Sequence, residues 1–477
     1  MWRAQGPSLA LSLTGHTAGI TALALASDAS LLLSGAADGE LRVWLPATGT
    51  PRGVWKGHSE AVWALAFNAG STLAFSASAD KSVRVWRTSD GICAAVLQGH
   101  NKAVLHLSLP LSSALCSASA DGVLHVWDVS YKSGSMLAPT TPAASQEAHS
   151  GKAVRSLAGN TKRLPGILFS TGGDGSVHAW RCGQRSKDAP LECLAMAELR
   201  PAGGAEGTAL ALHCTSDAQP VMTLYASCAD GTVTSWRLHT SRGLAALTCS
   251  PLSVLEAGAT NLHALALSRD GLLLFGARAD GAVCLWRARH TGAASEAGGG
   301  AHSAELGVLL EPSHQGPVRV CLLSPDGKWL YSAGLDGVVM QWDTSTGLCT
   351  ATLDGGHVGA IATACLSKTG AALFTGSADR SVGVWQVAAP EQGQVLGGRT
   401  CLGDPVALRL VATGKDAHNR VATRLTTAFQ VMTQPSASLW TRLSALLPRR
   451  PPPAEPAAAP AAVHDNDVHD WHPKSAP

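Results

Sequence analysis

Short apolar runs alternate with polar turns along most of the chain up to residue 390. Runs such as KSVRVW (81–86) and GVLHVW (122–127) alternate apolar and polar residues with a period of two. That period is typical of a half-buried β-strand. Turn sequences such as SPDG (324–327) separate the runs. The pattern therefore predicts an all-β fold of short strands joined by tight turns.

An internal repeat organises these strands. Up to residue 390, an Asp followed six positions later by Trp occurs eight times, and Gly follows the Asp in six of these copies. The pairs are Asp38/Trp44, Asp80/Trp86, Asp121/Trp127, Asp174/Trp180, Asp230/Trp236, Asp280/Trp286, Asp336/Trp342 and Asp379/Trp385. A repeat with a period near 42 residues and four short strands per unit is typical of one propeller blade. The sequence predicts a single closed β-propeller of eight four-stranded blades within residues 1–390.

Six of the repeats also carry a His, and a Ser or Thr, before the Asp. On these residues the chain resembles the tryptophan–aspartate (WD) repeat family, in which the four side chains of a blade form a hydrogen-bonded structural tetrad. The resemblance implies the tetrads His16–Ser34–Asp38–Trp44, His58–Ser76–Asp80–Trp86, His100–Ser117–Asp121–Trp127, His149–Ser170–Asp174–Trp180, His314–Ser332–Asp336–Trp342 and His357–Thr375–Asp379–Trp385. A buried Trp N–H needs an acceptor, which gives this set a physical reason of its own.

Blades 5 and 6 depart from the family pattern. They have Ala226 and Gly276 in place of the hydroxyl, and neither has the His. Blade 6 also has Arg278 two residues before Asp280. Residues two apart on a strand share a face, so Arg278 either pairs with Asp280 and braces the blade, or reaches the rim as a charged anchor for a partner. Both hypotheses are open at this point.

Ring closure is predicted from the N-terminal strand. The segment SLALSLTGH (8–16) supplies an apolar strand before the first Gly-His, in the place that LCTATLDGGH (348–357) takes before blade 8. We expect it to pair as the outer strand of blade 8, because an open ring would leave strand edges exposed. Three low-complexity insertions, at 132–145, 182–193 and 291–305, are interpreted as surface loops.

Two segments follow the predicted propeller. Residues 391–447 are predicted to be partly folded, with an amphipathic helix at about 436–447 that docks on the propeller or in a partner's groove. Residues 448–477 are rich first in Pro and Ala, then in His and Asp, and are predicted to form a disordered tail. The tail contains Trp471, a candidate docking residue, which should be replaceable without loss of stability. Metal binding by the tail histidines is the less favoured alternative to a solvated tail.

Catalysis and cofactor binding are not predicted. Ser, His and Asp can form a catalytic triad, but an enzyme has no use for six copies around a ring. No glycine-rich phosphate-binding loop stands between a strand and a helix. We therefore expect no enzyme activity, no cofactor and no structural metal site.

Composition narrows the range of partners. The 36 basic and 34 acidic residues nearly balance, and no basic stripe is present, so direct binding to nucleic acid is not expected. No run is long and apolar enough to span a membrane. The 12 cysteines contain no C-x-x-C pair and are interpreted as buried small residues in a reducing compartment, the cytoplasm, the nucleus or both.

The predicted function is that of a non-catalytic scaffold, a monomeric propeller that assembles other proteins on its faces. The alternative is a substrate receptor of a ubiquitin ligase, but the W-D-x-R motif of such receptors has only imperfect matches, WDVS (127–130) and WRAR (286–289). The residue before each turn Asp should face a partner. These rim residues are small except for Leu335, so we predict recognition by shape and apolar contact.

Overall fold

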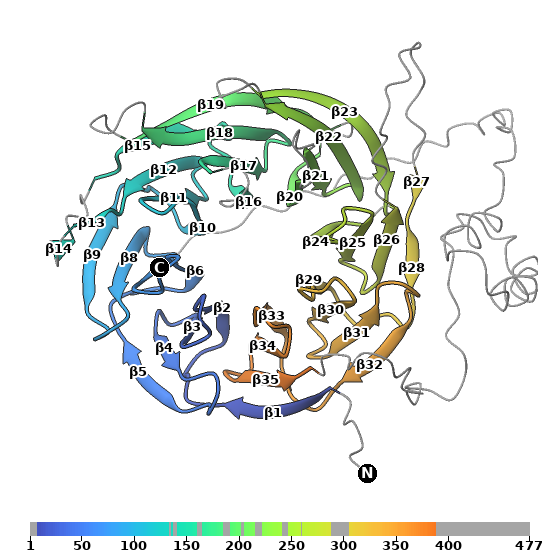
Figure 1. Ribbon diagram of the computed structural model, residues 1–477, viewed down its shortest axis with the longest axis horizontal. Helices are drawn as coiled ribbons and strands as arrows, with labels where there is room; N and C mark the ends of the chain where they lie inside the picture. Colours follow the sequence, from blue (N-terminus) through green and yellow to red (C-terminus); the bar gives the residue numbers. More distant parts are fainter. Residues whose placement is uncertain are drawn as a thin grey trace, which may run out of the picture. The chain divides into compact units, whose positions relative to one another are not determined.

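The structure is a computed structural model that describes residues 7–132, 135–136, 141–159, 165–184, 191–201, 205–214, 222–240, 247–258, 260–287 and 305–387. Apart from one two-stranded hairpin, its strands form eight sheets arranged around a ring, which we number as blades 1 to 8 (Figure 1). The predicted all-β propeller of eight blades is confirmed. The predicted segments 391–447 and 448–477, with Trp471, lie outside the described residues. Within the described part, no helix has the length and hydrophobicity that a membrane crossing requires.

Each blade runs from an inner strand near the centre of the ring to an outer strand at its periphery (Figure 1). Blade 1 consists of β2 (Ile20–Leu25), β3 (Leu32–Ala36), β4 (Leu41–Trp44) and β5 (Pro51–Trp55). Blade 2 consists of β6 (Val62–Phe67), β7 (Leu73–Ser78), β8 (Ser82–Arg87) and β9 (Cys93–Gln98). Blade 3 consists of β10 (Val104–Leu111), β11 (Ala114–Ser119), β12 (Val123–Asp128) and β15 (Ala144–Glu147). Blade 4 consists of β16 (Val154–Gly159), β17 (Ile167–Gly172), β18 (Val177–Gln184) and β19 (Leu191–Leu199).

The second half of the ring repeats this order. Blade 5 consists of β20 (Gly207–Cys214), β21 (Met222–Cys228), β22 (Thr232–Thr240) and β23 (Leu247–Glu256). Blade 6 consists of β24 (Leu262–Leu267), β25 (Leu273–Arg278), β26 (Val283–Arg287) and β28 (Val308–Leu310). Blade 7 consists of β29 (Val318–Leu323), β30 (Trp329–Gly334), β31 (Val339–Asp343) and β32 (Cys349–Leu353). Blade 8 consists of β33 (Ile361–Leu366), β34 (Ala372–Ser377), β35 (Val382–Gln386) and the N-terminal β1 (Ser8–Leu13).

The ring closes as predicted. Strand β1 pairs antiparallel with β35, with Leu13 opposite Val382 (Figure 1). The first described strand of the chain therefore completes the last blade, and the outer edge of β35 is covered.

The insertions differ in part from the predicted surface loops. Residues 132–145 contribute to the short hairpin of β13 (Tyr131–Lys132) and β14 (Ser135–Met136) and to the start of β15. Cys182 and Cys193 are directly paired strand residues of β18 and β19. Glu305 belongs to β27 (Glu305–Leu306), a short fifth strand parallel to β23. Low sequence complexity did not reveal that strand pairing continues into the ends of these insertions.

The hydrophobic core lies between neighbouring blades. Trp86 of blade 2 packs in one cluster with Leu33 and Val43 of blade 1. Trp127 of blade 3 packs with Phe75 and Val83 of blade 2. The repeated Trp therefore fills the gap to the preceding blade, which explains why each blade carries a large aromatic side chain at the same position.

Candidate functional site

Blade 2 shows how one repeat is braced. The Trp86 Nε1–H donates to Ser76 Oγ at 2.9 Å, and Ser76 Oγ lies 2.7 Å from His58 Nε2. The other ring nitrogen of His58 lies 2.7 Å from Asp80 Oδ2. Burial opposes ionisation of Asp80, but hydrogen bonds from His58 and Ser82 outweigh it and lower the pKa of this carboxyl. The chain of bonds thus joins the core Trp to a charged turn residue.

The same four-residue chain occurs in three further blades. In each, the Trp N–H donates to the hydroxyl, and the His bridges hydroxyl and carboxylate at 2.7–3.0 Å. The residues are His149, Ser170, Asp174 and Trp180 in blade 4; His314, Ser332, Asp336 and Trp342 in blade 7; and His357, Thr375, Asp379 and Trp385 in blade 8.

Blades 1 and 3 lack the bond between His and Asp. His16 binds Ser34 at 2.6 Å, but Asp38 accepts from Thr17 instead. His100 binds Ser117 at 2.8 Å, whereas its Nδ1 lies 3.6 Å from Asp121, beyond hydrogen-bond distance. The structure therefore brings together the His, hydroxyl and Trp of all six predicted sets, and the Asp of four.

In five blades the Gly after the Asp lies against the loop that leads into the next blade. Gly39 has a φ of 83°, and a Cβ there would lie 2.6 Å from the carbonyl oxygen of His58 in blade 2. Only Gly combines the left-handed conformation with so close an approach. The preference for Gly after the Asp is thus explained by a contact between blades, which the linear sequence did not show.

The tetrad hydroxyls are fully buried. Ser76, for example, has no exposed surface, and its oxygen already binds Trp86 and His58. A nucleophile must reach a substrate, and these hydroxyls cannot. The repeated His–Ser–Asp constellation is therefore a structural brace rather than a catalytic triad.

Comparison with known proteins agrees with this architecture. The sequence profile of the WD domain, G-beta repeat, matches residues 7–44, 49–87, 91–128, 306–343 and 347–386. Each match ends at or within two residues of a repeated Trp, in blades 1, 2, 3, 7 and 8. This chain is a WD-repeat β-propeller.

This chain is similar to each of its curated relatives over one short stretch of sequence. The chain is 39% identical over 87 residues to telomerase protein component 1 of Rattus norvegicus and 38% identical over 100 residues to that of Mus musculus. It is 35% identical over 79 residues to eukaryotic translation initiation factor 3 subunit I of Aspergillus terreus. These stretches are 18%, 20% and 17% of this chain, and they span 3%, 4% and 23% of the respective relatives.

A solved structure shares the fold over most of the propeller. The computationally designed Ika8 protein superimposes with a TM-score of 0.59 at 25% identity. The match covers 80% of this chain and all of the Ika8 chain.

Blade 6 of the WD-repeat propeller replaces the tetrad with an ion pair. Arg278 is only 5% exposed, and its guanidinium donates to both carboxylate oxygens of Asp280 and to the carbonyl of Ala257. A Cβ on Gly258, which aligns with the tetrad His, would lie 3.6 Å from this guanidinium. Trp286 donates instead to the carbonyl of Glu256 at 3.2 Å. Arg278 thus fills the place of the missing His and points inward, which favours the brace over the anchor.

Arg278→Ala is expected to lower the free energy of unfolding by about 1–3 kcal/mol. The change removes hydrogen bonds to a charged group and leaves the Ala257 carbonyl without its donor. The loss stays moderate because the Asp280 side chain is 40% exposed and can be solvated. Chemical denaturation measures it, with Arg87→Ala on the partly exposed surface as the control. An unchanged midpoint together with lost partner binding would restore the anchor hypothesis.

His125 of blade 3 is a buried base without a hydrogen-bond partner among the described residues. Neither of its ring nitrogens is bonded, and its ring lies 4.1 Å from that of His100. Burial and the neighbouring His100 lower the pKa of His125 to about 4. His125 does not stand out in the sequence, because its place in the alternation pattern is that of any strand residue facing the core.

His125→Met is expected to reduce the acid sensitivity of the propeller. Between pH 6.5 and about 4 the unfolded His binds a proton that the folded one resists, so stability falls as the pH falls through this window. Met340 holds the equivalent position in blade 7, so Met fits there. The unfolding midpoint should drop less between pH 7.5 and pH 5 in the variant than in the parent. Equal drops in the two proteins would contradict the prediction.

Leu335 is the other predicted partner residue that the structure describes. Leu335 is 41% exposed on the rim of blade 7. Val358, which was not predicted, is fully exposed on the neighbouring blade 8, where its N–H donates to Asp379 Oδ2 at 3.0 Å. A Cβ on Gly337 would lie 3.1 Å from the His357 carbonyl, so the rim loops of these two blades touch. Leu335 and Val358 together are called the blade 7–8 rim pair below.

Proposed function

We propose that this WD-repeat propeller is a non-catalytic scaffold that assembles a multiprotein complex on its rim. Its polar constellations are used internally, since the His, hydroxyl and Trp groups bind one another in the core. Its rim instead offers small residues and the exposed blade 7–8 rim pair. Exposed apolar side chains on a rigid frame fit recognition of proteins by shape and apolar contact.

The relatives support the same proposal. Their names describe a component of telomerase and a subunit of a translation initiation factor, so both belong to larger assemblies. We propose protein partners for this chain without assigning it to either assembly. A monomeric propeller in the cytoplasm, the nucleus or both is part of the proposal, and fluorescence microscopy of a fusion protein tests the location.

Affinity purification of the tagged full chain tests the scaffold. Leu335→Asp combined with Val358→Asp should abolish co-purification of most partners, because two carboxylates would replace the apolar contact. Ile92→Asp is the matched control, since Ile92 is another exposed apolar residue, located in the turn between β8 and β9. That control should keep the partners.

Three results would count against this proposal. Partners retained by the double variant would show that the rim pair is not the contact. Binding that collapses between low and high salt would indicate ionic instead of apolar recognition. Stable capture of a ubiquitin-ligase adaptor would favour the alternative function of a substrate receptor.

A further inference from the structure

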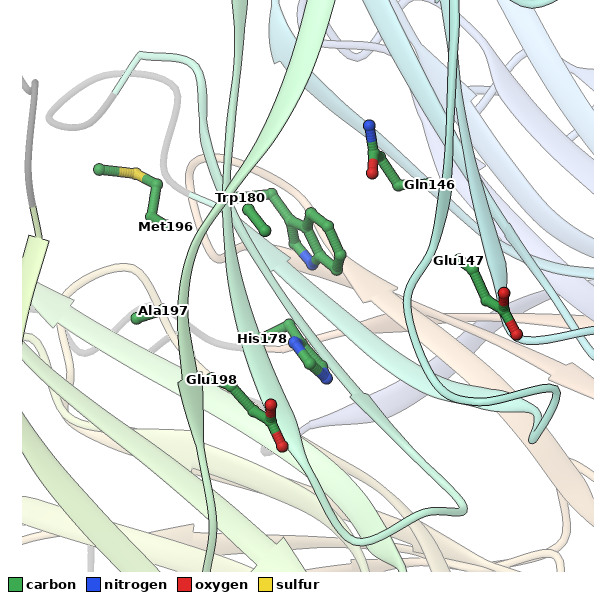
Figure 2. A pocket seen from close by; sticks show the side chains of 8 residues that line it. Gln146, Glu147, His178, Trp180, Met196, Ala197 and Glu198 are labelled. Atoms are coloured by element: carbon green, nitrogen blue, oxygen red, sulfur yellow. The ribbon is translucent and has the colours of Figure 1, made fainter.

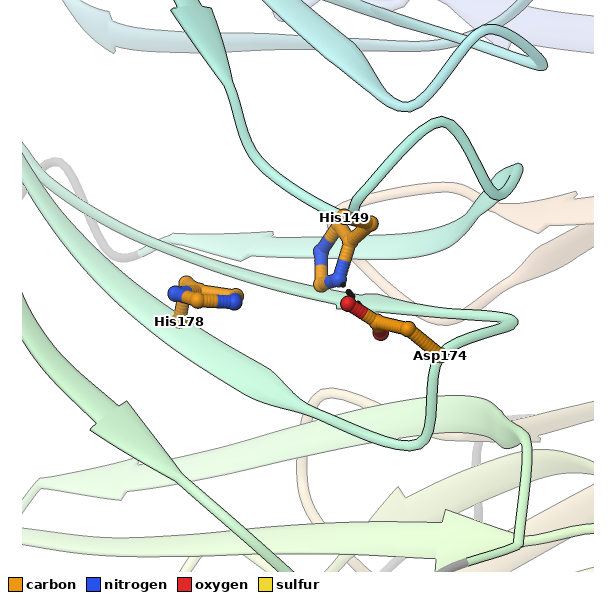
Figure 3. Close-up of side chains that lie close together, drawn as sticks. All are labelled: His149, Asp174 and His178. Atoms are coloured by element: carbon orange, nitrogen blue, oxygen red, sulfur yellow. Dashed lines mark hydrogen bonds and ion pairs between the residues drawn. The ribbon is translucent and has the colours of Figure 1, made fainter.

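Blade 4 combines a second imidazole with a complete tetrad, in which His149 is bonded to Asp174. The residue two positions before the repeated Trp is His178 in this blade. The equivalent residues are Arg42, Arg84, His125, Thr234, Cys284, Met340 and Gly383. Ligand atoms of His149, Asp174 and His178 all lie within 4.8 Å of one another (Figure 3). Among the described residues this is the single His, Cys, Asp or Glu cluster with that geometry.

These ligand atoms converge on one point. The hydroxyl of Ser176 lies 2.9 Å from Asp174 Oδ1, 3.1 Å from His149 Nδ1 and 2.9 Å from His178 Nε2. Two nitrogens and one carboxylate oxygen around a single point form a ligand set typical of divalent transition metals. A rotation of the Ser176 side chain would vacate that point.

The surface next to the three proposed ligands is hollow and carries acidic side chains. A cavity of about 470 Å³ beside the cluster is lined by Glu147, Asp174, His178, Glu198 and Arg200. Figure 2 shows Glu147, His178 and Glu198 around the adjoining cavity of about 380 Å³. Three carboxylates face one guanidinium in the larger cavity, so a cation is favoured there. Glu198 pairs directly with His178 across β18 and β19 and can supply a fourth ligand, the second oxygen of the set.

The protonation states suit metal binding. Burial lowers the pKa of His149 despite the neighbouring Asp174. Burial and then His149 lower the pKa of His178. Burial opposes ionisation of Asp174, but hydrogen bonds from Ser176 and His149 outweigh it and lower the pKa. Neutral imidazole and ionised carboxylate are the forms that bind metals.

The second ring nitrogen of His149, which would not bind the metal, is held by a hydrogen bond. Its Nε2 lies 2.9 Å from Ser170 Oγ, which in turn accepts from Trp180. A bond from the second ring nitrogen to a polar group fixes the plane of a metal-binding imidazole. The structural brace of blade 4 thus already holds one ligand in place.

We propose that blade 4 binds a divalent transition-metal ion of the zinc and cobalt class through His149, Asp174 and His178, with Glu198 as a further oxygen ligand. This site is independent of the scaffold function and of the rim pair.

Metal titration of the full chain tests the site. The histidines of the tail, His464, His469 and His472, are replaced by alanine in every protein so that they add no background. Isothermal titration with Zn²⁺ should find one ion bound, and Co²⁺ should give the visible absorption of a low-symmetry site with nitrogen ligands. His178→Gln should weaken binding at least tenfold, whereas His125→Gln, its counterpart in blade 3, should leave it unchanged.

A loss of metal binding must be distinguished from a loss of folding. Thermal melting without metal shows whether His178→Gln is folded. If it is not, Glu198→Gln, on a half-exposed side chain, replaces it and should weaken Zn²⁺ binding by a smaller factor. No Zn²⁺ binding and no Co²⁺ absorption by the parent protein, or equal binding by parent and folded His178→Gln, would overturn the proposal.

Discussion

Trp127→Ala is expected to lower the free energy of unfolding by about 3–5 kcal/mol, the usual cost of removing a large buried aromatic side chain. Trp127 has no exposed surface and packs against Phe75 and Val83 of the preceding blade. Its Nε1–H also donates to Ser117 Oγ at 2.9 Å, so the change leaves a cavity and removes a buried hydrogen bond. Chemical denaturation followed by circular dichroism measures the loss.

Trp63→Ala is the matched control for this change. Trp63 lies on β6 and is 45% exposed, so its replacement should cost less than about 1 kcal/mol. Equal midpoints for the two variants would mean that the blades are not held together by the repeated Trp.

Leu13→Asp is expected to open the ring and to cost at least about 3 kcal/mol. Leu13 is 4% exposed and packs with Trp44, Phe374 and Val382, which belong to the first and last blades. A carboxylate there must be dehydrated or must pull β1 away from β35. The open ring would expose a strand edge, so the variant should also form oligomers, which light scattering detects.

Leu11→Asp provides the comparison within the same strand. Leu11 is 37% exposed, so an aspartate there remains in water and the variant should stay a folded monomer. If Leu13→Asp behaved like Leu11→Asp, strand β1 would not be needed to hold the ring closed.

The repeat determines how much of the fold could be predicted from sequence. The spacing of six residues between Asp38 and Trp44 recurs in every blade, so blade number, strand number and closure followed from it. The bulge between Val43 and Trp44, where β4 pairs with β5, did not follow. A bulge depends on how two strands twist against each other, and the alternation pattern does not record that.

The side-chain sites were predictable only where a residue type implies its partner. A Trp N–H in the core needs an acceptor, and the hydroxyl ten residues earlier supplies it. The inward turn of Arg278 depends on space left by Gly258, a residue 20 positions away in the sequence. The contact between the rings of His178 and His149 depends likewise on which face of β18 is turned towards the loop that carries His149. Such relations between distant residues become visible only in three dimensions.

The pairing of β1 with β35 also has a consequence for biosynthesis. Leu13 leaves the ribosome before the repeats of the ring, but its partner Val382 belongs to the last strand of the eighth repeat. Contacts so distant along the chain require a large loss of loop entropy and form slowly. Until then Leu13, the side of the first blade that faces the last one, and the unfinished last blade expose apolar surface to the cell. The nascent chain should therefore depend on chaperones throughout its synthesis, and release from them should coincide with the moment when the last blade receives its fourth strand.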